Sequence, residues 1–370
     1  MDGIIIRRAR ESDLSQLIAM FAADDVGGHG DTTDADAYDD YLRAFNMIDA
    51  SQNEQLFVAE RDGDVVGTFQ ILFNRTLTGR GSLSMIIEAV QTRPDMRGKG
   101  IGAQMIMWPD PFCQMLVDRG FQVIRFDNRD VGRTTWFTRV RAPDVRAAIA
   151  RRYAGLRVDA PYTLSDMAGD AAGLLDHLQI DTAHVAGISM GGMIAQTLTI
   201  EHPERIRSLT SISSHDGSRR ALMAHPAALA ALLSPRPQDR EGAQDRAVSL
   251  FSTLRGSRYP LDEPELRSRV GMAWDRGSNP GAGRNQMAAI LASGDRGAAL
   301  RKVRVPTLVI HGDEDRLTTP YGGRRVASAV PGATLKMLSG VGHRMPRELW
   351  SVYQDAVATV AGVGDQRAAK

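Results

Sequence analysis

The spacing of apolar residues changes near residue 100, from a helix and hairpin pattern to short apolar runs that alternate with helices. Before that point, residues 12–21 carry apolar side chains at helical spacing. Residues 56–73 form two β-rich runs around an Asp-Gly pair, which is typical of a hairpin. A further apolar run at residues 84–92 predicts another strand.

The remainder of the chain has the pattern of a parallel sheet. Short apolar runs predict strands at residues 122–127, 183–188, 207–213, 306–310 and 333–338. Helical patterns lie between them, and strands that alternate with helices favour a parallel α/β fold. The sequence therefore predicts a mainly parallel α/β sheet preceded by a partial α+β segment.

Composition adds limits to this picture. The 370 residues have room for two ordinary domains or one large one. A formal net charge of +1 does not indicate a protein that binds nucleic acid or an anionic membrane. Cys113 is the single cysteine, which excludes an internal disulfide framework and fits a reducing cytosol. No apolar run reaches the about 18–20 residues of a membrane span, and the N-terminal apolar stretch is too short for a signal peptide, so we expect a cytoplasmic protein.

A glycine-rich stretch, Arg97–Gly102 (R-G-K-G-I-G), follows the predicted strand at residues 84–92. Glycines let the backbone come close to a phosphate, and free N–H groups at the start of a helix are donors for it. The stretch therefore suits a pyrophosphate-binding loop, and a tight turn is the alternative interpretation.

The order of helix, acidic loop, hairpin, strand and R-x-x-G-x-G resembles the front half of GNAT-type N-acetyltransferases over residues 3–102. The resemblance implies that Glu88 acts through water as a general base, although an ordinary strand carboxylate fits that position as well. Proline residues 109 and 111 interrupt the helix that should follow the loop, so the acetyltransferase half is incomplete. The resemblance implies that acetyl-CoA is held by Arg97, Gly98, Lys99, Gly100, Ile101 and Gly102.

A second motif, G-x-S-x-G at Gly187–Gly191, lies between a short apolar strand and a helix in AHVAGISMGGMIAQTLTIEHPERI. This context is that of a nucleophile elbow, in which a serine sits on a strained turn. Small neighbours are required because strand and helix crowd the turn. We therefore predict Ser189 as a catalytic nucleophile.

The partners of a serine nucleophile should follow in the order acid, then histidine. VPTLVIHGDEDRLTTP predicts a strand that ends in an acidic loop, and ATLKMLSGVGHRMP predicts a strand that ends at His343. Both loops leave the carboxyl ends of strands, where α/β sheets place their sites. We predict Asp315 as the acid, with Asp313 as the competing candidate, and His343 as the base.

Together with GIGAQMIMWPD and RFDNRDVGR, these motifs resemble the serine α/β-hydrolase superfamily over residues 100–362, in particular its carboxylesterase and methylesterase-like members. The resemblance implies an α/β-hydrolase-type domain at residues 100–370, after a partial GNAT-like segment at residues 1–99. It implies a helical lid at residues 216–298.

The same resemblance places further groups at the site. An oxyanion hole needs two donors, and the N–H of Met190, directly after the nucleophile, is one of them. The resemblance implies that the N–H of Ile101 is the second. It also implies that the loop Asp127–Arg133 packs beside the site.

The two resemblances meet at residues 100–102, and both assign the strand at residues 84–92 to their own sheet. We expect the larger hydrolase sheet to take this strand, between residues 122–127 and 183–188. The hairpin at residues 56–73 would then be displaced or lie at the sheet edge.

The predicted function is a serine hydrolase that cleaves small-molecule carboxylic esters through an acyl-enzyme, with no cofactor and no metal. The alternatives are an acetyl-CoA-dependent N-acetyltransferase, or a non-functional hybrid of the two families.

Overall fold

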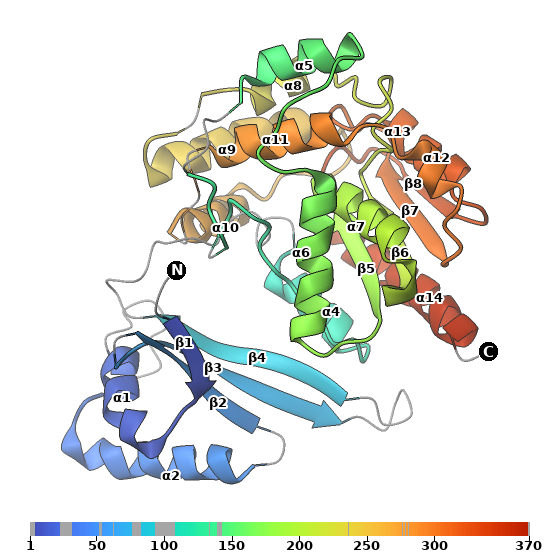
Figure 1. Ribbon diagram of the computed structural model, residues 1–370. Coiled ribbons are helices and arrows are strands. Elements are labelled where there is room, and N and C mark those ends of the chain that lie inside the picture. Colours follow the sequence, from blue (N-terminus) through green and yellow to red (C-terminus); the bar gives the residue numbers. More distant parts are fainter. Residues whose placement is uncertain are drawn as a thin grey trace. The chain divides into compact units, whose positions relative to one another are not determined.

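The computed structural model (Figure 1) describes residues 4–22, 32–51, 54–61, 63–75, 83–92, 108–132, 134–138, 143–235, 237–275, 277, 279 and 281–368. The chain divides into two compact units. One comprises residues 1–99 with 113–125, and the other comprises residues 100–112 with 126–370.

The first unit contains a four-stranded antiparallel sheet in the order β1-β2-β3-β4. Its elements are β1 (Ile4–Arg8), α1 (Leu14–Ala22), α2 (Tyr38–Ala50), β2 (Glu54–Arg61), β3 (Asp64–Arg75) and β4 (Leu83–Thr92). Strands β2 and β3 pair up to Arg61 and Asp64, so the predicted hairpin is confirmed.

Helices α1 and α2 supply the apolar core of this unit together with the strands they contact. The buried side chains are Ala9, Leu14, Leu17, Ile18, Met20, Phe45, Val58 and Val65. An ion pair joins Arg7 of β1 to Asp13 at 2.6 Å, and the same guanidinium reaches Glu60 of β2 at 2.6 Å. The hydrogen bond from Arg7 holds the pKa of Asp13 below its ordinary value, against the effect of burial.

Strand β4 corrects one expectation. It pairs with β3 from Gly67↔Thr92 to Arg75↔Leu83, in the antiparallel sheet and not in the parallel one. Residues 122–127, expected as its parallel neighbour, have no strand structure. Pairing with the strand just before it in the chain closes a short loop, whereas pairing with residues 183–188 closes a much longer one, and this favours β3.

The second unit is built on a parallel sheet of four strands in the order β5-β6-β7-β8. The strands are β5 (Ala183–Ile188), β6 (Ile206–Ile212), β7 (Thr307–Gly312) and β8 (Thr334–Leu338). The helices that contact them are α7 (Met190–Glu201), α13 (Pro320–Ala329) and α14 (Trp350–Ala368), and α6 (Leu164–His177) packs on α7. Each connection between neighbouring strands is a crossover that passes through at least one helix, as parallel pairing requires. Since the strands run in the same direction, their carboxyl ends meet at one edge of the sheet.

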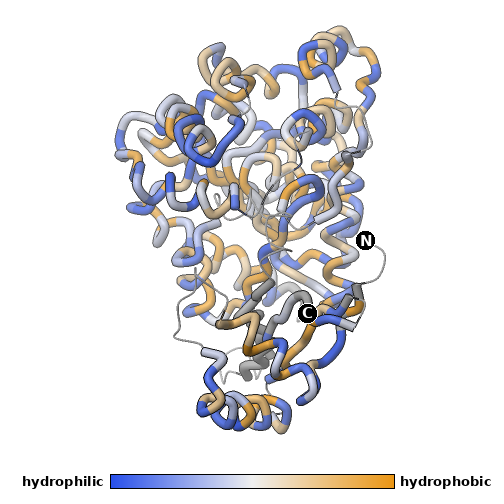
Figure 2. The backbone as a smooth tube through the Cα atoms, turned by 90° about the vertical axis from the view of Figure 1, so that its left-hand side faces the viewer, coloured by the Kyte–Doolittle hydropathy of each residue, from blue (hydrophilic) through white to orange (hydrophobic). Residues whose placement is uncertain are grey.

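Five helices lie between β6 and β7, in the segment predicted to be helical. They are α8 (Pro226–Leu232), α9 (Arg240–Leu254), α10 (Glu263–Asp275), α11 (Ala282–Ser293) and α12 (Gly297–Leu300). α9 packs on α8 and α10, while α11 contacts α6 and α5 (Val145–Tyr153). Hydrophilic and hydrophobic residues alternate along the helices at the top of Figure 2, as expected for helices with one buried face. We refer to residues 216–298 as the helical insertion.

Helix α4 (Asp110–Val117) begins between the two prolines that follow the glycine-rich stretch, with Pro111 as its second residue. The chain leaves it through Gly120, whose φ of 86° lies in the left-handed region that glycine favours. These bounds suit the sequence, in which Pro111 fits the first turn of a new helix and Gly120 fits its end.

Candidate active site

Ser189 occupies the sharp turn between β5 and α7, with φ of 55° and ψ of −119°. This is a strained conformation for a residue with a side chain. A side chain at Gly187 would place its Cβ 2.0 Å from the carbonyl oxygen of Gly191, so only glycine fits there. The crowding explains why glycine stands two residues before the serine.

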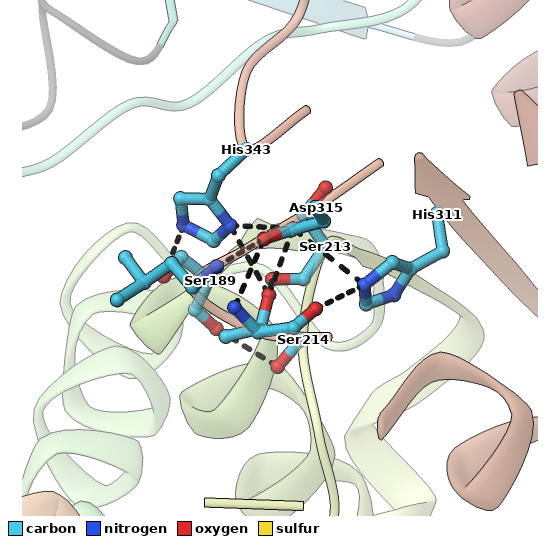
Figure 3. Close-up of polar contacts among 8 residues, drawn as sticks. Ser189, Ser213, Ser214, His311, Asp315 and His343 are labelled. Carbon is cyan, nitrogen blue, oxygen red and sulfur yellow. Dashed lines mark hydrogen bonds and ion pairs between the residues drawn. The ribbon is translucent and has the colours of Figure 1, made fainter. Parts of the chain in front are cut away.

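Three side chains form a continuous hydrogen-bonded chain at the carboxyl ends of the parallel strands (Figure 3). The Nε2 atom of His343 lies 2.9 Å from Ser189 Oγ, and its Nδ1 atom lies 2.7 Å from Asp315 Oδ2. His343 follows β8, and Asp315 follows β7. Both are buried, at 5% and 3% exposure, whereas Ser189 is half-buried.

The surroundings of Asp315 favour its ionised form. Oδ1 accepts hydrogen bonds from the backbone N–H groups of Leu317 at 2.8 Å and Thr318 at 3.0 Å. Burial alone would raise the pKa of Asp315, but the neighbouring His343 ring, the nearby His311 and the N–H of Leu317 lower it below its ordinary value. A carboxylate held in this form can accept from Nδ1–H of the imidazole, which leaves the Nε2 lone pair free for a hydroxyl proton.

Asp313, the competing acid, has a different partner. Its Oδ1 atom accepts a hydrogen bond from the backbone N–H of Gly340 at 2.7 Å, in the loop that carries His343. The structure therefore brings Asp315, and not Asp313, to the histidine.

The histidine loop is also joined to the end of α9. The N–H of His343 donates to the carbonyl oxygen of Leu254 at 2.7 Å, and that of Gly342 donates to Arg255 at 3.1 Å. A Cβ on Gly342 would lie 1.9 Å from the Leu254 oxygen, so glycine is required for this approach. Beside it, Ser257 donates its N–H and hydroxyl to the Glu314 carboxylate at 2.7 and 2.6 Å.

A buried carboxylate, Asp130, anchors another part of the helical insertion. Its Oδ2 atom accepts from Tyr162 Oη at 2.7 Å and from Asn285 Nδ2 at 2.8 Å. Its Oδ1 atom accepts from Asn279 Nδ2 and from the N–H of Phe137. Burial opposes ionisation, but these four donors hold the pKa of Asp130 below its ordinary value.

Several polar residues near the serine were not singled out from the sequence. Ser214 Oγ donates to the carbonyl oxygen of Ser189 at 2.9 Å. Thr318 lies between Asp315 and His343, and His311 Nε2 donates to its carbonyl oxygen. The available signal was position, because Ser214 lies two residues after the end of the buried strand β6, at the edge where the site lies.

The remaining candidates differ in what the structure says of them. Met190 is the first residue of α7 and follows Ser189 directly. Glu88 lies in β4, in register with Gln70. The stretch Arg97–Gly102, which includes Ile101, lies outside the described residues, so its assignments remain predictions.

The described residues also bear on metal sites and membrane spans. No cluster of three or more His, Cys, Asp or Glu side chains suited to a metal ion occurs there. No helix in that part of the chain has both the length and the apolar character needed to cross a membrane.

Comparison with known families agrees with this geometry. The family model described as "alpha/beta hydrolase fold" matches residues 100–345. The chain belongs to this family. Residues 17–108 match the model of the acetyltransferase (GNAT) family, so both resemblances seen in the sequence are confirmed.

Individual relatives of this alpha/beta hydrolase carry esterase and hydrolase names. Rhodomycin D methylesterase DnrP of Streptomyces peucetius is 29% identical over 259 residues, which cover 65% of this chain and 80% of the relative. The 3-oxoadipate enol-lactonase 2 of Acinetobacter baylyi is 31% identical over 180 residues, or 48% of this chain and 63% of the relative.

Solved structures support the fold. The meta-cleavage product hydrolase CumD of Pseudomonas fluorescens superposes with a TM-score of 0.51 at 17% identity, over 71% of this chain and 87% of that chain. A hydrolase from Pseudomonas aeruginosa gives a TM-score of 0.51 at 22% identity, over 79% and 98% of the two chains.

Proposed function

We propose that this alpha/beta hydrolase cleaves carboxylic esters through an acyl-enzyme formed on Ser189. The observation that carries the proposal is the continuous hydrogen-bonded chain from Ser189 Oγ through His343 to Asp315. Relatives named as a methylesterase and an enol-lactonase support an ester as the substrate class.

In the proposed reaction, Ser189 Oγ attacks the ester carbonyl carbon while His343 Nε2 accepts its proton. Asp315 holds the other ring proton on Nδ1 and stabilises the imidazolium. The tetrahedral intermediate expels the alcohol, which takes the proton from Nε2, and an acyl ester remains on Ser189. Water then attacks this ester with His343 again as the base, and the carboxylic acid is released.

The negative oxygen of the tetrahedral intermediate needs backbone donors. We assign one of them to the N–H of Met190, which directly follows the nucleophile, and the second to the N–H of Ile101. A serine nucleophile requires neither a metal nor a cofactor for these steps.

A panel of nitrophenyl esters of increasing acyl length, run on wild type and Ser189→Ala, tests the proposal. We expect hydrolysis by the wild type and a loss of about 10⁶-fold in kcat on Ser189→Ala, because no other group can form the acyl intermediate. A fluorophosphonate probe should label the wild type at Ser189 and leave the variant unlabelled. Equal hydrolysis by both proteins would disprove the assignment.

The GNAT match over residues 17–108 supports a second candidate function, binding of acetyl-CoA by the first unit for transfer to an amine. Its test is calorimetric titration of the full chain with acetyl-CoA. Binding that is lost in Arg97→Ala but kept in Ser189→Ala would support it, and absence of binding by the wild type would exclude it.

A further inference from the structure

Thr318 is a buried residue whose polar atoms all have partners within the site, and it is 4% exposed. Its N–H donates to Asp315 Oδ1 at 3.0 Å, and its carbonyl oxygen accepts from His311 Nε2. Its hydroxyl lies 2.7 Å from the carbonyl oxygen of Ser213, 3.0 Å from Asp315 Oδ2 and 3.1 Å from His343 Nδ1. The residue therefore touches both members of the acid–histidine pair.

The single hydroxyl hydrogen decides what this contact does. A threonine hydroxyl donates one hydrogen and accepts with its lone pairs. The carbonyl oxygen of Ser213 is the nearest acceptor, at 2.7 Å against 3.0 Å for Asp315 Oδ2, and it belongs to a residue that is 2% exposed and needs a donor. With the hydrogen directed to Ser213, the Thr318 oxygen presents a lone pair to Nδ1–H of His343.

The backbone of Ser213 supports this direction. Its φ of 45° is unusual for a residue other than glycine, and its N–H donates to the carbonyl oxygen of Ile310 at 2.9 Å. The turn after β6 thus fixes the Ser213 carbonyl oxygen independently of Thr318. Such a fixed acceptor orients the Thr318 hydroxyl before substrate arrives.

We propose that Thr318 is a positioning residue for the histidine. Its hydroxyl oxygen is a second acceptor for Nδ1–H, beside Asp315 Oδ2, and the two acceptors keep that hydrogen on Nδ1. The unprotonated Nε2 then faces Ser189 Oγ, as a general base requires. This inference rests on the proposed function, since it concerns how His343 is prepared to activate Ser189.

The test compares two substitutions at Thr318 with a matched control one residue away. Thr318→Val keeps the shape and removes the hydroxyl, and Thr318→Ser keeps the hydroxyl and removes the methyl group. Thr319→Val is the control, because Thr319 is half-buried in the same loop and its side chain makes no cap hydrogen bond to α13. Each protein is assayed for kcat and KM on one nitrophenyl ester, for the rate of fluorophosphonate labelling of Ser189, and for its melting temperature.

We expect Thr318→Val to lower kcat and the labelling rate by about 10- to 100-fold with KM within twofold, since a misplaced base slows the chemistry and not substrate binding. Thr318→Ser should restore both rates to within about threefold of wild type, and Thr319→Val should match wild type. Wild-type rates in Thr318→Val would overturn the proposal. Equal losses in Thr318→Val and Thr318→Ser would also overturn it, because they would assign the effect to the methyl group. If Thr318→Val does not fold, Thr318→Ala replaces it with the same expected results.

The labelling rate separates this inference from the proposed function. Labelling needs an activated Ser189 but no ester substrate. A wild type that is labelled yet cleaves no ester would count against the ester proposal alone, and slower labelling of Thr318→Val would still support the positioning role. A wild type that is not labelled would remove both.

Discussion

The two units of this chain assemble their sheets in opposite ways. In the first, each strand pairs antiparallel with the next strand along the sequence, and β2 and β3 are joined across residues 62–63. In the second, the strands are parallel, and β6 and β7 pair across residues 213–306. An antiparallel pair can be joined by a tight turn, as β2 and β3 are, whereas a parallel pair always needs a crossover connection.

The difference shows why the proposed chemistry lies in the second unit. Loops that follow parallel strands meet at one edge of the sheet, so residues far apart in the sequence converge there. Ser189 follows β5, Asp315 follows β7 and His343 follows β8. In the first unit, β4 pairs with β3, the strand just before it in the sequence, and the unit has its own apolar core. Substitutions in the two units should therefore have separable effects.

The largest expected effect is that of Asp315→Asn in the second unit. An amide cannot stabilise the imidazolium and favours the wrong tautomer of His343, so kcat should fall about 10⁴-fold. Asp313→Asn is the matched control, since an amide oxygen can still accept from the N–H of Gly340, and it should keep most of the activity. Steady-state kinetics on a nitrophenyl ester measure both, and equal losses would refute the assignment of the acid.

The next effect is on the stability of the second unit. Asp130→Ala leaves the buried donors of Tyr162, Asn279 and Asn285 without their acceptor, which should lower the free energy of unfolding by about 3 kcal/mol. Calorimetry should show an earlier transition for this unit and an unchanged one for the first. Asp144→Ala removes the side-chain cap of α5 and should cost only about 1 kcal/mol. A common shift of both transitions would contradict the division into separable units.

The converse substitution is made in the first unit. Leu17 is 0% exposed in its core, and Leu17→Ala should destabilise that unit by about 2–5 kcal/mol by leaving a cavity. Ester hydrolysis should continue at the wild-type rate below the melting temperature of the variant. A parallel loss of kcat would show that the first unit supports the catalytic site.

The smallest expected effect is a difference between the two units in how their stability depends on pH. Among the described residues, carboxyl groups with a lowered pKa occur at Asp13 in the first unit and at Asp130, Asp166, Asp216 and Asp315 in the second. A carboxylate whose pKa is lowered by folding stabilises the protein above its unfolded pKa, about 3.9, and loses this contribution as the pH falls through the folded value. Both units should lose stability below about pH 4, the second more steeply. Asp130→Asn should reduce the slope of the second transition only, which calorimetry over this pH range measures.

Much of the fold could be predicted from local patterns. The hairpin and the parallel strands from residue 183 onward each have a sequence signal that lies within the element itself, whereas the helical insertion was expected from the family resemblance. The partner of β4 could not be predicted this way, because its apolar run fits either sheet and the outcome depends on loop closure. Residues 122–127 were wrongly predicted as a strand, since an apolar run indicates burial but does not provide a pairing partner.

The candidate site was predictable where a residue type has a distinctive place. Ser189 lies in a glycine-flanked elbow, and His343 and Asp315 each follow a strand at the expected edge. Thr318 has no such signal, because its contacts with Ser213 and His343 arise only when loops distant in sequence meet. The role of Ile101 as the second oxyanion donor stays a prediction, because this residue lies outside the described residues.

The joint between the end of α9 and the histidine loop limits how this enzyme can be redesigned. Exchanging the helical insertion for that of another hydrolase is an obvious way to change substrate preference. However, residues 254–258 bond directly to the backbone of the His343 loop, and Ser257 among them donates to the Glu314 side chain next to Asp315. A graft that replaces the insertion on both sides of residues 254–258 but keeps these residues would leave the hydrogen bonds to the His343 loop intact. One that replaces them would alter selectivity and turnover together, so the two properties could not be tuned separately.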